Sequence, residues 1–134
     1  MMAAIEIETR KSVDVIDITT LVQQQLKESG RESGICLVYT VHTTTGLTVN
    51  EADSALIQDI LGLLEKLAPA GAGYRHDRSD GNAHAHLRAT LLGNSVVIPF
   101  ENGKMLLGTW QRILFFELDG PRRRTVQCKA IPDR

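Results

Sequence analysis

Short segments in which apolar and polar residues alternate recur through this 134-residue chain and constrain its fold more than any other feature. Such alternation is typical of a β-strand with one face in the core and the other in water. Many of the segments are joined by short turns, so neighbouring strands are expected to pair antiparallel, and the first two to form a hairpin or meander. The predicted strands are residues 4–10, 13–18, 35–42, 95–100, 104–107, 110–118 and 122–130.

Three other segments carry apolar residues at the 3.6-residue period of a helix. The clearest has an apolar stripe over residues 56–67, with Asn50 as its expected N-cap. The other two are expected to run from residue 19 or 20 to 26 and from Asn82, as N-cap, to 92. Strands paired locally, rather than alternating with helices, predict an α+β fold with a mainly antiparallel sheet and about three helices.

Length and composition indicate one domain covering residues 1–134, because 43% hydrophobic residues are enough for a single core. The formal net charge of −1 creates no long-range attraction to nucleic acid or to an anionic membrane, so a small-molecule ligand is expected. No apolar run reaches the roughly 20 residues of a membrane span, and nothing resembles an export signal. A cytoplasmic location is expected, with Cys36 and Cys128 as buried thiols.

All four histidines lie between residues 42 and 86, and imidazole is the commonest metal ligand in proteins. His84 and His86 are two apart on a predicted helix, so their side chains diverge by about 200° and only His86 is expected in a site. His42 at a strand end, His76 in a loop and His86 near a helix start could converge at one rim of the sheet. Three imidazoles with an open position describe a zinc-type centre. Three unrelated histidines are the alternative.

The segment after residue 42 holds three consecutive threonines and leads to the expected helix start. Hydroxyl groups and the free N–H groups of a helix start can bind phosphate, which makes Thr43, Thr44 and Asn50 candidate substrate-binding residues. Glu51 is a candidate acid or base close to the histidines. Its alternative role is to complement the helix dipole.

The last predicted hairpin places a charged pair on its inner face. Alternation puts Arg124 on the same face as Val126 and Cys128, and a four-residue loop would set Glu117 directly opposite Arg124. Such a buried pair is either a structural bridge or subunit contact, or an arginine that holds an anionic substrate and is oriented by Glu117.

Trp110 and Gln111 stand at the start of a predicted strand, shortly after Gly108. A lone tryptophan is usually part of the core. Beside Gln111, it could instead offer a stacking face and an amide to a flat heterocyclic substrate.

Taken in order, these motifs resemble the YjbQ family, also called the secondary thiamine-phosphate synthase family. The resemblance covers nearly the whole chain and includes the positions of the three candidate histidines, of Asn50 and Glu51, and of Glu117 and Arg124. The position of His84 is not a histidine throughout the family. The motifs are HTTTGLTVNE from residue 42, YRHD from residue 74, NAHAHL from residue 82, LLGNSVVIPF from residue 91, GKMLLGTWQRI from residue 103 and FELDGPRRR from residue 116.

The resemblance implies a trimer of α+β subunits with a histidine cluster, His42, His76 and His86, that is associated with a divalent metal. The family name implies that a hydroxymethylpyrimidine diphosphate and a thiazole phosphate are joined to thiamine phosphate with release of pyrophosphate. That reaction could be a side activity. Zinc suits the histidines, whereas Mg²⁺ suits a diphosphate substrate. A trimeric, non-catalytic binder of a phosphorylated molecule and a metal-dependent phosphate-directed hydrolase are the alternatives.

Overall fold

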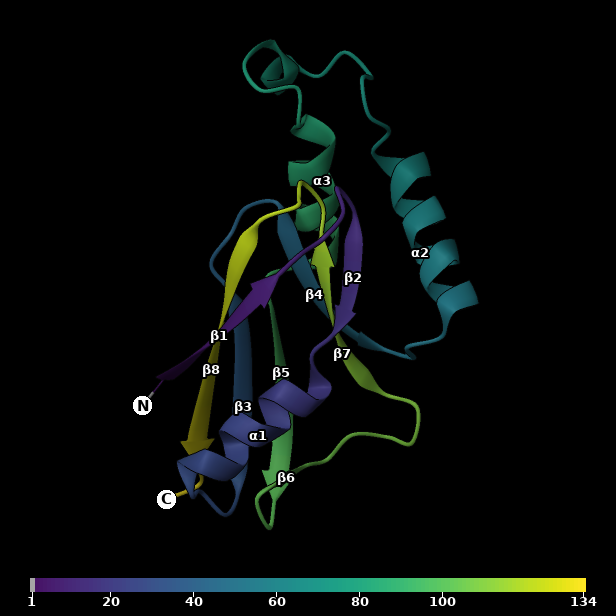
Figure 1. The fold of residues 1–134 in the computed structure, drawn as a ribbon. Coiled ribbons are helices and arrows are strands. Elements are labelled where there is room, and N and C mark those ends of the chain that lie inside the picture. Colours follow the sequence, from purple (N-terminus) through teal and green to yellow (C-terminus); the bar gives the residue numbers. More distant parts are fainter. Residues whose placement is uncertain (1) are drawn as a thin grey trace.

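The computed structural model describes residues 2–134 and confirms the predicted α+β class (Figure 1). The elements, in chain order, are β1 (Met2–Glu8), β2 (Asp14–Asp17), α1 (Thr19–Ser29), β3 (Gly34–Thr40), β4 (Thr45–Asn50), α2 (Ser54–Leu67), the 3₁₀ turn η1 (Arg75–Arg78), α3 (Ala83–Leu92), β5 (Ser95–Glu101), β6 (Lys104–Met105), β7 (Arg112–Glu117) and β8 (Arg123–Pro132). No helix in residues 2–134 is long and apolar enough to cross a membrane.

The strands form two antiparallel sheets, one with the order β1-β8-β3-β5-β6 and one with the order β2-β7-β4. This arrangement corrects two predicted pairings. β1 pairs with β8 while β2 pairs with β7, so the first two strands form no hairpin. β7 and β8 also lie in different sheets, although a short turn joins them. Alternation fixes which face of a strand is buried, but it does not fix the partner of that strand.

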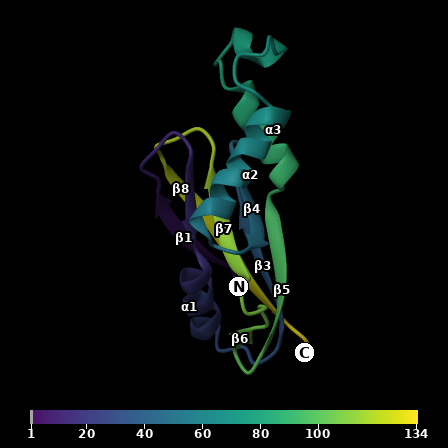
Figure 2. The same ribbon diagram turned by 90° about the vertical axis from the view of Figure 1, so that its right-hand side faces the viewer.

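The main core fills the space between the two sheets and is closed by α1 (Figure 1). β7 lies at the centre of the fold, because its side chains are buried on both faces. Ile113 and Phe115 join the main core, whereas Leu114 and Phe116 pack with Leu64 of α2 and with α3 in a second cluster. Figure 2 shows α2 and α3 together on the side of the three-stranded sheet, with α1 apart from them.

The outer face of the five-stranded sheet carries exposed apolar side chains on β3, β5 and the end of β8, beside charged residues such as Glu8 and Arg123 on β1 and β8. Ile35 and Tyr39 of β3 are 41% and 40% exposed, and Val97 of β5 and Ile131 of β8 are 54% and 37% exposed. Their neighbours Cys36 and Val38 point to the core, as the alternation predicts. An apolar face of this kind is typical of a surface that another protein chain covers.

The segment 45–50 is a strand rather than the approach to a helix. Asn50 ends β4, and α2 begins at Ser54 with Asp53 as its N-cap, whose carboxylate accepts the N–H of Leu56 at 2.9 Å. The predicted cap at Asn50 was therefore wrong, and Glu51 lies in an exposed loop. β-branched threonine and valine at 45, 48 and 49 favour an extended chain over a helix.

α3 covers residues 83–92, and Asn82 occupies its N-cap position, as predicted. Asn82 makes no side-chain capping bond; the carboxylate of Asp77 accepts the N–H of Ala83 instead, at 3.0 Å. The C-terminal end of α3 is hydrogen-bonded to β4, because the N–H of Leu47 donates a hydrogen bond to the carbonyl of Gly93. Gly46 allows this approach, since a Cβ there would lie 2.7 Å from the Cβ of Leu92.

Candidate functional site

Arg124 and Glu117 form a buried ion pair between the two sheets. The Arg124 Nε donates to Oε1 of Glu117 at 2.8 Å and Nη2 contacts Oε2, while the two residues are 4% and 0% exposed. The predicted contact between Arg124 and Glu117 is therefore present, but the two residues lie on strands of different sheets and not on the two strands of one hairpin. Arg124 pairs with Ile7 in its own sheet, and Glu117 pairs with Asp14 and Thr45 in the other.

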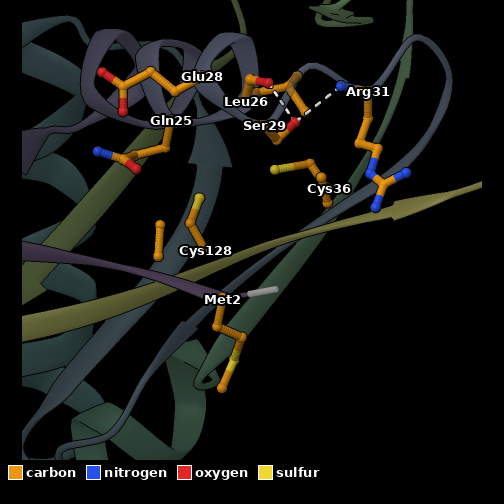
Figure 3. Close-up of a pocket in the computed structure, with 10 residues that line it drawn as sticks. Met2, Gln25, Leu26, Glu28, Ser29, Arg31, Cys36 and Cys128 are labelled. Carbon is orange, nitrogen blue, oxygen red and sulfur yellow. Dashed lines mark hydrogen bonds between the residues drawn. The ribbon is translucent and has the colours of Figure 1, made fainter.

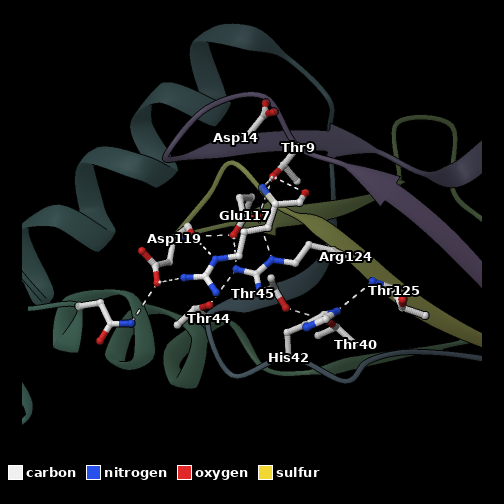
Figure 4. A network of polar contacts seen from close by, with 12 residues as sticks. Thr9, Asp14, Thr40, His42, Thr44, Thr45, Glu117, Asp119, Arg124 and Thr125 are labelled. Carbon is white, nitrogen blue, oxygen red and sulfur yellow. Dashed lines mark hydrogen bonds and ion pairs between the residues drawn. The ribbon is translucent and has the colours of Figure 1, made fainter. Parts of the chain in front are cut away.

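The Glu117 carboxylate accepts two further hydrogen bonds (Figure 4). The hydroxyl of Thr9 donates to Oε1 at 2.8 Å, and the backbone N–H of Asp119 donates to Oε2 at 3.1 Å. Burial alone would raise the pKa of Glu117, but the hydrogen bonds from Arg124 and Thr9 outweigh it and hold the pKa below its ordinary value. Glu117 is therefore charged near neutral pH and holds the Arg124 guanidinium in place.

Arg124 also reaches the threonine run, because its Nη2 donates to the hydroxyl of Thr44 at 2.8 Å. Thr44 is buried, whereas Thr43 beside it is exposed. The next residue, Thr45, shares a hydrogen bond of 2.7 Å with Thr40, which holds the turn between β3 and β4 closed. The turn thus brings the Thr44 hydroxyl to the end of Arg124, and Thr43 lines the same pocket.

His42 lies two residues beyond β3 and accepts a hydrogen bond from the backbone of β8 (Figure 4). The N–H of Thr125 donates to Nε2 at 2.9 Å. A neutral imidazole that accepts at Nε2 carries its proton at Nδ1, so His42 is a hydrogen-bond donor through Nδ1. Burial and the nearby Arg124 guanidinium lower the pKa of His42, which favours this neutral form.

These groups face a pocket of about 670 Å³. This size suits a small organic ligand. The pocket is lined by the threonine turn, the start of α3, the 119–122 turn and the buried Arg124. The lining residues are Val41, His42, Thr43, Thr44, Asp80, Asn82, His86, Asp119, Arg122 and Arg124.

His86 lines this pocket together with His42, and His76 packs against His86 from the 3₁₀ turn. The ring centroids of His76 and His86 are 4.7 Å apart with an interplanar angle of 80°. His84 is not among the lining residues, and its buried Nδ1 has no hydrogen-bond partner. The structure therefore places His86 on the pocket side of α3.

A shared metal centre does not fit these three histidines as they stand in one chain. The lone pair of His42 Nε2 accepts the hydrogen bond from the N–H of Thr125, and Nδ1 of His42 carries the proton. Neither nitrogen of His42 is therefore free to bind a metal ion. Within residues 2–134, no group of three or more His, Cys, Asp or Glu residues is arranged to hold one. Metal binding through the histidines stays a prediction.

The other candidate residues lie at the opposite end of the three-stranded sheet. Asn50 pairs with Arg112 at the start of β7, whereas Glu117 ends that strand, a separation of about 17 Å at the usual rise per residue. Glu51 adjoins Asn50, and its N–H donates to the Asn50 side chain at 2.8 Å.

Trp110 and Gln111 lie in the turn before β7, not at a strand start, and Trp110 is 70% exposed. The side-chain oxygen of Gln111 accepts the N–H of Gly108 at 2.7 Å and closes this turn. Neither residue lines the pocket of its own chain. The candidate residues thus form two groups, one at each end of β7.

Sequence reasoning missed five residues of the pocket, namely Val41, Asp80, Asn82, Asp119 and Arg122. The carboxylate of Asp119 accepts hydrogen bonds from Nη2 of Arg122 and from Nδ2 of Asn82, both at 3.0 Å. The side-chain oxygen of Asn82 is buried and has no hydrogen-bond partner within the described residues. For Asp119 a signal was present in the sequence, because the turn at 119–121 begins two residues after Glu117.

A family model described as UPF0047 protein YjbQ-like matches residues 3–133. The chain belongs to the YjbQ family. A UPF0047 protein from Archaeoglobus fulgidus is 57% identical over 125 residues, which cover 93% of this chain and 97% of that protein. The UPF0047 protein YugU from Bacillus subtilis is 40% identical over 135 residues, covering 98% of this chain and 99% of YugU.

Solved structures of similar proteins share this fold. A YbjQ-like protein of unknown function from Sulfolobus solfataricus superposes with a TM-score of 0.96 at 36% identity and covers 99% of this chain and 97% of its own. A hypothetical protein from Aeropyrum pernix K1 gives a TM-score of 0.95 at 41% identity, with 99% of both chains covered. The fold of this chain is thus shared by solved structures of similar proteins from two archaea.

Proposed function

We propose that the pocket between His42 and Arg122 binds the phosphate end of a small molecule and that the protein is a small-molecule transferase. The observation that carries this proposal is the gathering of hydrogen-bond donors in one pocket: the guanidinium groups of Arg122 and Arg124, the hydroxyls of Thr43 and Thr44, and the Nδ1–H of His42. Guanidinium and hydroxyl donors are the groups that recognise phosphate oxygens.

The reaction that we propose is the one its family name implies, the formation of thiamine phosphate. The thiazole nitrogen attacks the methylene carbon of the pyrimidine diphosphate; a C–N bond forms, the C–O bond to diphosphate breaks, and its electron pair leaves with pyrophosphate. Donors already in place stabilise the negative charge that develops on that leaving group. Arg122 and Arg124, with His42, would supply them, while Glu117 holds Arg124 in position.

The same pocket suits Mg²⁺ better than zinc. Mg²⁺ is commonly bound by one or two carboxylates together with substrate phosphates, and Asp80 and Asp119 both line the pocket. A diphosphate that entered with Mg²⁺ would therefore find the carboxylates of Asp80 and Asp119 in the same pocket as the arginines. When bound, the ion would neutralise part of the diphosphate charge.

A site shared between copies of the chain would bring the two groups of candidate residues together. We place the pocket of one subunit of a homotrimer next to Trp110 of the partner subunit. The exposed apolar face around Ile35, Tyr39 and Val97 supports association, because its burial against another copy removes apolar surface from water. Exposure of Trp110 supports the same arrangement, since a stacking residue must be free to meet its ligand.

The test compares Arg122→Gln with Arg123→Gln. Arg122 lines the pocket, whereas Arg123 points outward and pairs with Glu8 on the surface, so the second variant changes the same charge outside the site. Thiamine phosphate binding and its synthesis from the two precursors are measured with Mg²⁺. We expect Arg122→Gln to weaken binding and turnover at least about tenfold, the effect of losing one charged hydrogen bond, and Arg123→Gln to leave both unchanged.

The outcomes separate the candidate functions. Binding without turnover by the wild-type protein would favour a non-catalytic binder of phosphorylated molecules. Release of phosphate or pyrophosphate from a single substrate would favour a hydrolase. Equal effects of the two arginine variants would show that the pocket is not the phosphate site.

A further inference from the structure

The two cysteines lie side by side on the inner face of the five-stranded sheet, away from the site described above. Cys36 of β3 pairs with Ala130 of β8, and Cys128 of β8 pairs with Val38 of β3. The cysteines are therefore diagonal neighbours on adjacent strands and share one face. They are 1% and 5% exposed.

Both cysteines line a pocket of about 370 Å³ between the sheet and the C-terminal part of α1 (Figure 3). Leu26, Ala3 and Ala130 give this pocket apolar walls, and polar residues such as Arg31 lie among its remaining lining residues. Figure 3 shows both sulfur atoms on the side of the sheet that faces α1, while the Met2 side chain points away from them. The thiols are thus buried among protein atoms, yet a small species in the pocket can reach them.

The diagonal relationship decides what the pair can do. Diagonal residues of neighbouring antiparallel strands are about 7–8 Å apart at the backbone, whereas a disulfide requires Cα atoms within about 6.8 Å. A metal ion between the sulfur atoms spans a greater distance than an S–S bond. We propose that Cys36 and Cys128 bind one soft, thiophilic metal ion of the Cu(I) class. Thiolates select such ions, and hard cations prefer oxygen ligands.

Binding requires both thiols to ionise. Two S–H bonds break, two sulfur–metal bonds form, two protons pass to solvent, and the metal keeps its oxidation state. The complex of two thiolates with a monovalent ion carries one negative charge, which the guanidinium of Arg31 in the pocket lining can offset.

The experiment is an anaerobic titration of the intact, reduced protein with Cu(I) against a competing chromophoric chelator. We expect one Cu(I) per chain, with ultraviolet absorption from the thiolate-to-copper bonds. Cys36→Ser and Cys128→Ser should each abolish this binding, since a single thiolate is not enough. Gln25→Ala, at another residue that lines the pocket, is the matched control and should bind one Cu(I).

A second measurement avoids the risk that a serine variant fails to fold. Bound Cu(I) should protect both thiols of the wild-type protein from alkylation, as seen by mass spectrometry, whereas Mg²⁺ should give no protection. Absence of copper binding by the wild-type protein, unprotected thiols in its presence, or full binding by a folded single-serine variant would each overturn the proposal.

Discussion

The backbone N–H of Thr125 donates to Nε2 of His42, at the place where the ladder between β3 and β8 stops. That ladder ends with Thr40 opposite Val126, so the next N–H of β8 lacks a strand partner. The imidazole supplies one. His42 therefore has a structural task that fixes its tautomer, and the same hydrogen bond leaves Nδ1–H as the donor that it can offer to a ligand.

Protonation of His42 is expected to destabilise the protein in mild acid. Its pKa in the folded chain is below the ordinary value of 6.5, chiefly because of burial and Arg124. As the pH falls below about 6.5, the unfolded chain therefore binds this proton before the folded chain does. The free energy of unfolding, measured with urea from pH 8 to pH 5, should decrease over that range.

His42→Gln is the control for this pH dependence, because the glutamine oxygen can accept a hydrogen bond but does not titrate. Its free energy of unfolding should fall less steeply over the same pH range than that of the wild-type protein. Parallel curves for the two proteins would mean that His42 does not have a lowered pKa.

Metal content offers a separate test of the histidine prediction. The lone pair of His42 Nε2 is used by Thr125, so His42→Ala should not change the amount of zinc that the protein retains after loading and dialysis, measured by elemental analysis. Zinc that is retained by the wild-type protein and lost in His42→Ala would restore the three-histidine centre.

Removal of the Glu117 carboxylate should be strongly destabilising. Glu117→Leu leaves the Arg124 guanidinium buried without its counter-ion, a change that typically costs about 3–5 kcal/mol. The comparison is Glu8→Leu, which breaks the exposed pair with Arg123 and should leave the free energy of unfolding nearly unchanged. Urea unfolding at pH 7 measures both, and similar losses in the two variants would contradict the structural importance of the buried pair.

The same ion pair shows what sequence alone can predict. Alternation correctly placed Arg124 on the inner face, and the proximity of Glu117 followed from the short turn between them. The partner strands were wrong, because a short turn can also carry the chain from one sheet to the other. Hydrophobic pattern determines faces locally, whereas strand order depends on contacts between distant segments.

The candidate site was harder to predict for a related reason. The threonine run predicts the approach to a helix, but residues 45–50 form a strand that separates Asn50 from the pocket. Local patterns predict only a helix cap at Asn82 and a turn at Asp119, whereas the contact between these two residues joins segments 37 residues apart. A local sequence pattern accounts for Asn82 and Asp119 as a cap and a turn residue, and it gives no indication of their long-range contact.

A shared site predicts that two inactive variants can restore each other. Arg122→Gln alters the pocket, and Trp110→Ala alters the opposite end of β7, so a mixed trimer contains sites in which an intact pocket meets Trp110 of the partner subunit. Co-expressed chains carrying different tags should recover part of the thiamine phosphate binding that each variant alone has lost. Arg122→Gln mixed with His86→Ala is the matched control, because both changes fall in one pocket and no site can be intact. If purified mixed oligomers, verified by sizing and by both tags, recover no binding, Trp110 does not complete the site of a neighbouring copy.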